Sequence, residues 1–80
     1  MKLPRDVGGS DLARAIERYG YKITRQSGSH MRFTTQIGGE HHITIPSHKP
    51  LKVGTLSAIL DEISRHLKRD KLDLVKELRL

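Results

Sequence analysis

The spacing of apolar residues changes at Gly20, and this change limits the folds open to the chain. Before Gly20, four apolar residues follow the i, i+3, i+4, i+7 spacing of one helical face: Leu12, Ala15, Ile16 and Tyr19. Ser10 is a good N-cap and Gly20 is a usual helix stop, so we expect a helix over residues 11–19. After Gly20 the spacing falls to two, which is typical of strands.

Three segments with alternating apolar and polar residues predict strands over 21–24, 30–35 and 41–45. Pro46 ends the third because it has no amide hydrogen to donate. One face of the sheet would be apolar: Tyr21, Ile23, Met31, Phe33, Ile43 and Ile45. The other would be polar: Lys22, Thr24, His30, Arg32, Thr34, His42 and Thr44. We therefore expect the first face to pack on helices and His30 to lie on the other.

The C-terminal half predicts two further helices. After a segment over 47–51, a helix starts near 53–55 and carries apolar residues at helical spacing: Leu56, Ile59, Leu60 and Ile63. A third amphipathic stretch, about 69–78, presents Leu72, Val75 and Leu78. The expected fold is a small α+β domain of order α-β-β-β-α-α, with helices on one face of a three-stranded antiparallel sheet. Its length suits a single domain over 1–80, with a core of about 10–66 and an extra C-terminal helix of about 69–79.

The net charge of +6 is concentrated in the middle of the chain. Residues 18–52 hold six basic residues against Glu40 alone, which favours a polyanionic partner, nucleic acid first. The chain has no cysteine, so disulfides and thiolate metal sites are ruled out. No apolar run reaches membrane-spanning length and residues 1–6 lack the apolar core of a signal peptide, so we expect a cytoplasmic protein without a membrane partner.

His30 stands at the end of a polar, turn-forming stretch between two predicted strands, where its side chain can face solvent while its backbone is held. Histidine exchanges protons near neutral pH. Arg25 and Arg32 lie close by in sequence and attract phosphates. The combination suggests acid–base chemistry on a nucleic-acid backbone, while the alternative is an ordinary surface histidine in a hairpin.

Lys49 and Lys52 precede the predicted helix that starts near 53–55, and His48 borders them. Free amides and the helix dipole favour an anion at a helix N-terminus, and adjacent lysines strengthen that preference. The alternative is a connecting segment with two solvated lysines.

Two hairpin registers keep the apolar residues on one face. Phe33 opposite Ile43 places His30 opposite Pro46, whereas Phe33 opposite Ile45 places His30 near position 48. Both registers hold His30 several residues along the sheet from His42, on the order of 13 Å or more at ~3.3 Å per residue. A metal held by these two histidines is therefore not expected.

The remaining histidines do not complete a metal site either. His41 and His42 are adjacent, so they point to opposite faces of a strand, and we expect structural roles for His41 and His66. A single imidazole on a basic surface suits a metal-independent ribonuclease, because RNA supplies its own nucleophile, the 2′-hydroxyl. Two rivals remain open: a non-catalytic RNA-binding module using the same face, and a helix-turn-helix DNA binder over 55–79, against which the balancing acidic residues there argue.

Three linked blocks of sequence resemble the HicA (YcfA-like) family of toxins from toxin–antitoxin pairs. They are Arg25-Gln26-x-Gly28-Ser29-His30, Ile43-Thr44-Ile45-Pro46-x-His48-Lys49-Pro50-Leu51 and Lys52-x-Gly54-Thr55-Leu56-x-x-Ile59-Leu60. The resemblance implies a fold like the double-stranded-RNA-binding domain and an mRNA interferase activity. It also implies that His30 is catalytic and that a HicB-type antitoxin covers it.

We expect RNA to be held without metal or cofactor by a set of residues around His30: Arg25, Gly28, Ser29, Arg32, His48, Lys49 and Lys52. The chain departs from the family at Met31, where many members carry a second histidine. Met31 is predicted to face the core, so we expect catalysis to survive.

Overall fold

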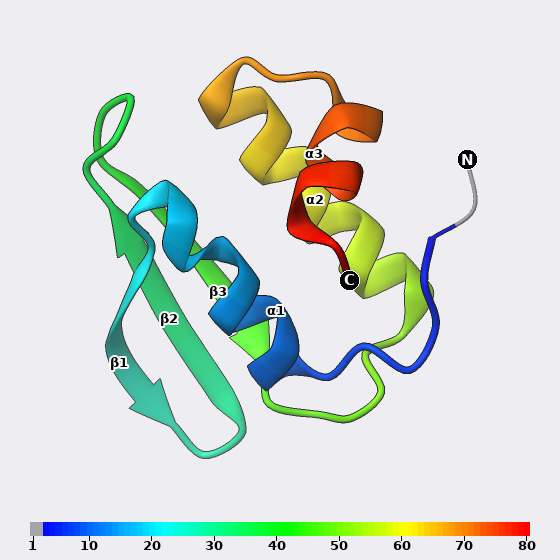
Figure 1. Cartoon of the computed structure of the whole chain (residues 1–80). Helices are drawn as coiled ribbons and strands as arrows, with labels where there is room; N and C mark the ends of the chain where they lie inside the picture. The colour runs from blue at the N-terminus through cyan, green and yellow to red at the C-terminus, as the bar shows by residue number, and fades with distance from the viewer. Residues whose placement is uncertain (1–2) are drawn as a thin grey trace.

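The computed structural model describes residues 3–80. A short helix α1 (Gly9–Ala15) continues into a 3₁₀ turn η1 (Ile16–Tyr19). Three strands follow, β1 (Lys22–Ser27), β2 (His30–Thr35) and β3 (His41–Pro46). Two helices, α2 (Val53–Leu67) and α3 (Lys71–Leu78), complete the chain (Figure 1). The predicted α+β order is confirmed.

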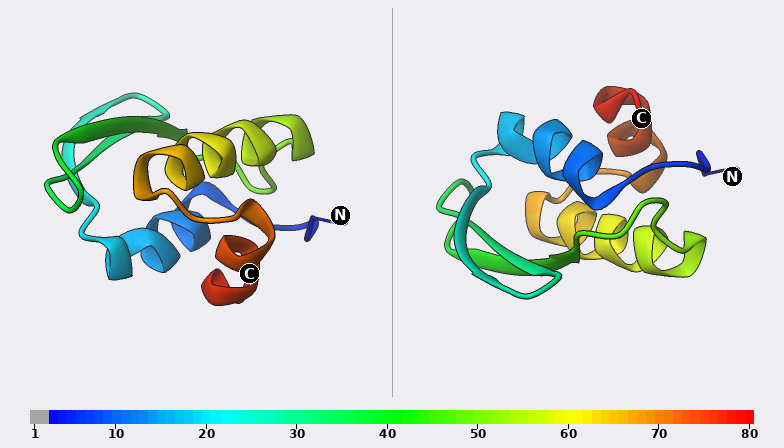
Figure 2. Two further views of the ribbon diagram at one scale, coloured as in Figure 1. Left: turned by 90° about the horizontal axis from the view of Figure 1, so that it is seen from above. Right: turned by 90° about the horizontal axis from the view of Figure 1, so that it is seen from below.

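The strands form one antiparallel sheet of order β1-β2-β3, and the helices lie on one side of it. Figure 2 shows α1 and α2 against this side, with α3 packed on them at a greater distance from the strands. We call the opposite side of the sheet the outer face. The predicted layering is therefore correct.

β2 and β3 pair without interruption from His30 opposite Pro46 to Thr35 opposite His41. Phe33 lies opposite Ile43, which confirms the first of the two predicted registers. Because directly opposed residues share a face, Met31, Phe33, Ile43 and Ile45 all face the helices and are buried.

β1 carries one extra residue relative to β2. Ile23 lies opposite Phe33, but the next paired residue is Arg25, opposite Arg32, so Thr24 forms a β-bulge. Strict alternation from Ile23 would direct Arg25 toward the helices. The bulge instead puts Arg25 on the outer face beside Arg32.

The core lies between the sheet and the helices, and it is joined by Val7 and Leu51 from the flanking segments. Most of the predicted apolar residues are buried, with Tyr21, which lies just before β1, wholly so. On the sheet, Ile23 is the exception: the prediction placed it in the core, yet it is 50% exposed. It faces the helix side, but β1 is an edge strand on which no residue is buried.

α1 begins two residues earlier than predicted, at Gly9, and its N-cap is Gly8 rather than Ser10. The Asp11 carboxylate accepts a hydrogen bond from the Gly8 amide at 2.8 Å, which replaces the expected hydroxyl cap. A Cβ atom on Gly9 would lie 1.9 Å from the carbonyl oxygen of Pro46. Glycine at this position therefore lets α1 approach the end of β3.

α3 is fixed to the rest of the domain by its buried and polar contacts. The carboxylate of its N-cap, Asp70, accepts from the amides of Leu72 and Asp73. Leu74 and Leu78 are buried, whereas Leu72, predicted to face the core, is 45% exposed. The buried side of α3 therefore consists of Leu74 and Leu78, and Val75 packs at its margin.

Polar contacts reinforce the position of α3. Lys71 reaches Ser57 and Asp61 of α2 at 2.7 and 2.8 Å, and Glu77 accepts from the Tyr19 hydroxyl at 2.5 Å.

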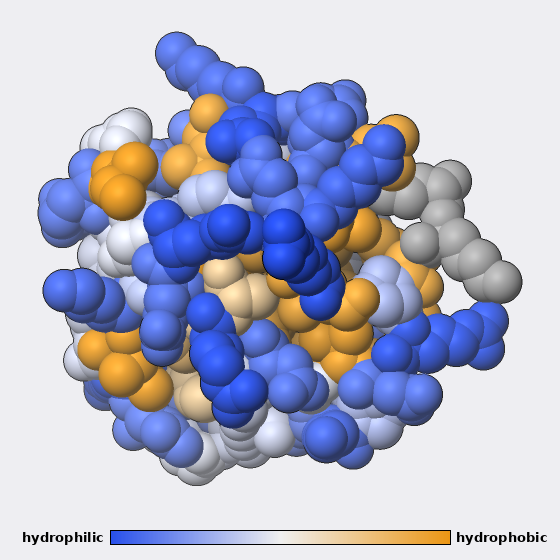
Figure 3. All heavy atoms as spheres, viewed as in Figure 1, coloured by the Kyte–Doolittle hydropathy of each residue, from blue (hydrophilic) through white to orange (hydrophobic). Residues whose placement is uncertain are grey.

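Seen from the helix side, apolar side chains appear in patches between polar ones (Figure 3). Within residues 3–80, no helix has both the length and the apolar character needed to span a bilayer.

Candidate nucleic-acid interface

His30 is the first residue of β2 and is exposed on the outer face. It pairs with Ser27 across a two-residue turn made by Gly28 and Ser29. Gly28 has a φ of +57°, at the first central position of the turn, where a type II′ turn favours glycine. The turn and the pairing with Pro46 hold the His30 backbone from both sides, while its side chain stays open to solvent.

Arg25 and Arg32 extend this site along the outer face. Both are exposed, and the bulge at Thr24 sets them directly opposite each other. In the described part of the chain, residues 3–80, neither guanidinium forms an ion pair with a carboxylate. Two adjacent cations without an internal counter-ion suit an anionic ligand.

The segment between β3 and α2 is tied to this end of the sheet by backbone hydrogen bonds. The Ser47 amide donates to the Ser29 carbonyl at 2.7 Å, which continues the ladder past Pro46. The His48 carbonyl accepts from Gly9 at 2.9 Å, and the Leu51 amide donates to Val7 at 2.7 Å. These bonds bring His48 to the His30 end of the sheet and leave its side chain exposed.

Lys49 and Lys52 lie further along the same segment, and both are exposed. Lys52 is the N-cap residue of α2, whose first turn has no acidic residue, and Lys49 packs its methylene groups beside Gly8. The structure thus brings Arg25, the turn, His30 and Arg32 together. The two lysines lie beyond His48, toward the start of α2.

Sequence reasoning missed a polar chain across the outer face. His42 Nδ1 lies 2.7 Å from the Thr34 hydroxyl, which lies 3.2 Å from the Thr24 hydroxyl. Glu40 approaches His42 Nε2 at 3.5 Å. Alternation places these side chains on one face, but only the bulge brings Thr24 within reach of Thr34.

The two histidines expected to be structural form a stacked pair. The His41 and His66 rings lie 4.4 Å apart at an interplanar angle of 12°. His66 Nε2 bonds the Ile37 carbonyl at 2.9 Å, and His41 Nδ1 bonds the Tyr21 hydroxyl at 2.8 Å. The pair joins α2 to the strands. No local pattern signals it, because the two residues lie on different elements.

Burial shifts the pKa values of His41 and Tyr21 in opposite directions. It lowers the pKa of His41, an effect that neighbouring His66 reinforces and Glu62 opposes. Burial, with a further contribution from Glu62, raises the pKa of Tyr21 to about 12. His41 Nδ1 and the Tyr21 hydroxyl therefore form a hydrogen bond between two neutral groups, in which the histidine tautomer decides which group donates.

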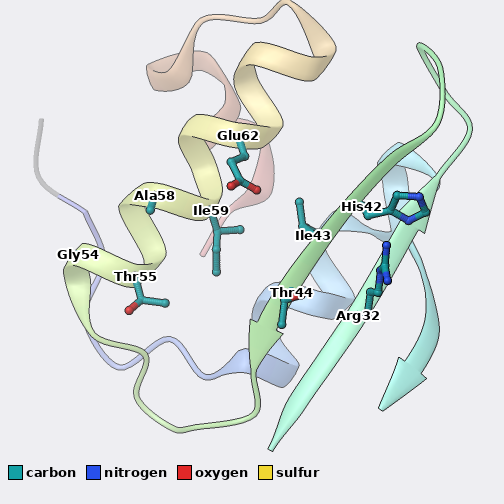
Figure 4. A pocket seen from close by; sticks show the side chains of 9 residues that line it. All are labelled: Arg32, His42, Ile43, Thr44, Gly54, Thr55, Ala58, Ile59 and Glu62. Atoms are coloured by element: carbon teal, nitrogen blue, oxygen red, sulfur yellow. The ribbon is translucent and has the colours of Figure 1, made fainter. Parts of the chain in front are cut away.

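An open groove of about 680 Å³ runs between β3 and α2. Figure 4 shows Arg32, His42 and Thr44 on its strand side. Thr55, Ala58, Ile59 and Glu62 of α2 form the opposite side. Within residues 3–80, no three histidine or carboxylate side chains gather in a manner that could hold a metal ion.

Together, the fold and this surface define a class: a small α+β domain whose sheet presents an exposed histidine among unpaired cations. A family model described as the HicA toxin of bacterial toxin–antitoxin systems matches residues 9–64. The chain therefore belongs to the HicA toxin family. Searches of curated proteins and of solved structures found no match.

Proposed function

We propose that this chain is an endoribonuclease toxin that cleaves mRNA without a metal, using His30 as its catalytic residue. The observation that carries the proposal is the placement of His30: exposed on the outer face, held by a hairpin, and flanked by Arg25 and Arg32. Membership of a toxin family supplies the biological setting.

The chemistry needs only what this surface offers. The RNA 2′-hydroxyl attacks the adjacent phosphorus, and the bond to the 5′-oxygen of the next nucleotide breaks. His30 acts as the acid or the base, taking the proton from the 2′-hydroxyl or giving one to the leaving oxygen. The products are a 2′,3′-cyclic phosphate and a 5′-hydroxyl. One positioned acid or base contributes roughly 10²–10⁴-fold to the rate.

The cations around His30 bind the substrate and stabilise developing charge. Arg25 and Arg32 hold the phosphates next to the scissile bond, and exposed His48, Lys49 and Lys52 continue the contact toward α2. Gly28 and Ser29 shape the approach, since a glycine turn lets a phosphate come near the backbone. Cationic side chains beside the phosphoryl oxygens lower the barrier because the negative charge on those oxygens grows in the transition state.

A toxin of this kind requires a protein that restrains it. We propose that a HicB-type antitoxin fills this role in the cytoplasm by covering the outer face around His30. The family match supports an antitoxin in general terms.

Induced expression in bacteria tests the proposal. The parent chain should arrest growth and deplete mRNA, whereas His30→Ala, expressed to the same level, should do neither. Arrest by both chains without RNA loss would mean that toxicity comes from binding. Intact growth and intact RNA with both would favour the non-catalytic RNA-binding module.

A further inference from the structure

The two edges of the sheet differ in how they are protected. β1 carries the Thr24 bulge and the exposed cations Lys22 and Arg25, devices that discourage a further strand from pairing there. The register of β3 with β2 is unbroken, so its free edge is straight. That edge borders the groove between β3 and α2.

The hydrogen-bond register identifies which backbone groups of β3 are free. The bond from Ser47 to Ser29 marks a hydrogen-bonded pair, and every second pair along the ladder shares that geometry. The intervening residues of β3 therefore direct their N–H and C=O groups away from β2. Pro46, which lacks an N–H, is one of them, and the others are His42 and Thr44.

The groove suits a single extended polypeptide. The free N–H and C=O groups of His42 and Thr44 alternate along the edge of β3. An extended backbone matches this pattern when it lies beside β3 at the ~4.8 Å distance between paired strands. Side chains of such a strand that point to the outer face would meet His42, which Glu40 already approaches, and Arg32, which has no carboxylate partner within residues 3–80 and favours acidic residues. Those pointing inward would meet Ala58 and Ile59 beside Glu62, which favours small apolar ones.

We infer that the antitoxin inserts an extended segment, with acidic residues at alternate positions, beside β3 as a fourth strand. A second copy of this chain is a poorer occupant, because each copy carries a net charge of +6 and α2 closes the far side of the groove. The inference rests on the antitoxin partner of the proposed function and assigns its docking site. Inhibition would then begin at β3, several residues from His30.

Thr44→Pro tests the inference, with Thr44→Ala as the matched control. Proline removes the outward N–H but leaves the bonds to β2, because Thr44 does not donate to that strand. We expect Thr44→Pro to weaken binding of the antitoxin that neutralises this chain by about tenfold or more, and Thr44→Ala to stay within about twofold. Equal affinity of the proline variant and the parent would overturn the inference.

Amide hydrogen exchange on the parent protein gives a second readout that needs no variant. The His42 and Thr44 amides should exchange quickly in the free chain and slowly in the antitoxin complex. Protection of these amides by an RNA oligonucleotide would show that RNA binds this edge instead. Protection on raising the toxin concentration alone would show that a second copy of this chain binds it. RNA cleavage by Thr44→Pro without antitoxin should match the parent, which separates failure of the docking site from failure of the nuclease proposal.

Discussion

Arg25 of β1 lies directly opposite Arg32 of β2 on the outer face of the sheet, and no carboxylate pairs with either within residues 3–80. Like charges at directly opposed positions destabilise a sheet. The arrangement exists only because the bulge at Thr24 redirects Arg25. A surface that opposes two cations in this way gains stability when a polyanion binds.

Arg25→Glu should therefore stabilise the free protein while weakening its hold on RNA. The substitution turns a repulsive pair into an attractive one, for an expected gain of about 0.2–1 kcal/mol in the free energy of unfolding. RNA affinity should fall at the same time, because a phosphate contact is replaced by a negative charge. Urea denaturation and RNA titration measure the two effects. Lys22→Glu is the control, since Lys22 lies opposite Thr34 and not opposite a charge.

Leu74→Ala should lower the stability of the domain far more than Leu72→Ala, because Leu74 lies on the buried side of α3 and Leu72 on its exposed side. Leu74 is wholly buried, so its truncation should cost about 2–5 kcal/mol. Leu72 is 45% exposed, and its truncation should change stability by less than about 1 kcal/mol. Equal losses in thermal or urea unfolding would contradict this placement of α3.

Stability should decrease as the pH falls below neutrality, because burial lowers the pKa of His41 from its ordinary value near 6.5. Between the folded pKa and 6.5 the unfolded chain binds more protons, so the free energy of unfolding rises with pH in that window. The His41 contribution is complete above 6.5 and is lost as the pH falls toward the folded value.

His41→Asn should flatten this dependence while keeping an acceptor for the Tyr21 hydroxyl. Urea unfolding of parent and variant at several values between pH 5 and 7.5 makes the comparison. An identical slope for both proteins would show that another group controls the acid response.

The number of strands and their inward and outward faces could be predicted because alternation is a local rule, although β1 runs to Ser27, three residues beyond its predicted end at 24. The pairing of Phe33 with Ile43 follows from keeping apolar residues on one face, although a second register satisfied the same rule. The exposure of Ile23 could not be predicted in this way, since it depends on how far the helices extend over an edge strand. The bulge at Thr24 could not be predicted from the sequence either, because it is defined by the pairing of β1 with β2.

The buried side of α3, the start of α1 and the histidine pair also depend on contacts between distant residues, which sequence patterns do not show. Leu72, Leu74, Val75 and Leu78 allow two apolar stripes, and packing against the earlier elements selects 74/78. Gly9, the first residue of α1, lies against the Pro46 carbonyl, a contact between residues that are far apart in sequence. His41 and His66 come together from different elements, so only the folded chain reveals their stacking.

Cleavage of a defined RNA by purified parent and His30→Ala proteins in the presence of a chelator tests whether His30 is the catalytic residue. We expect the parent to cleave, leaving cyclic-phosphate and 5′-hydroxyl ends, and the variant to be slower by roughly 10²–10⁴-fold. The variant should keep the parent's circular dichroism spectrum and its RNA affinity within about threefold, since His30 is exposed and contributes nothing to the core. Cleavage at the parent's rate by a folded His30→Ala protein would contradict the proposed mechanism.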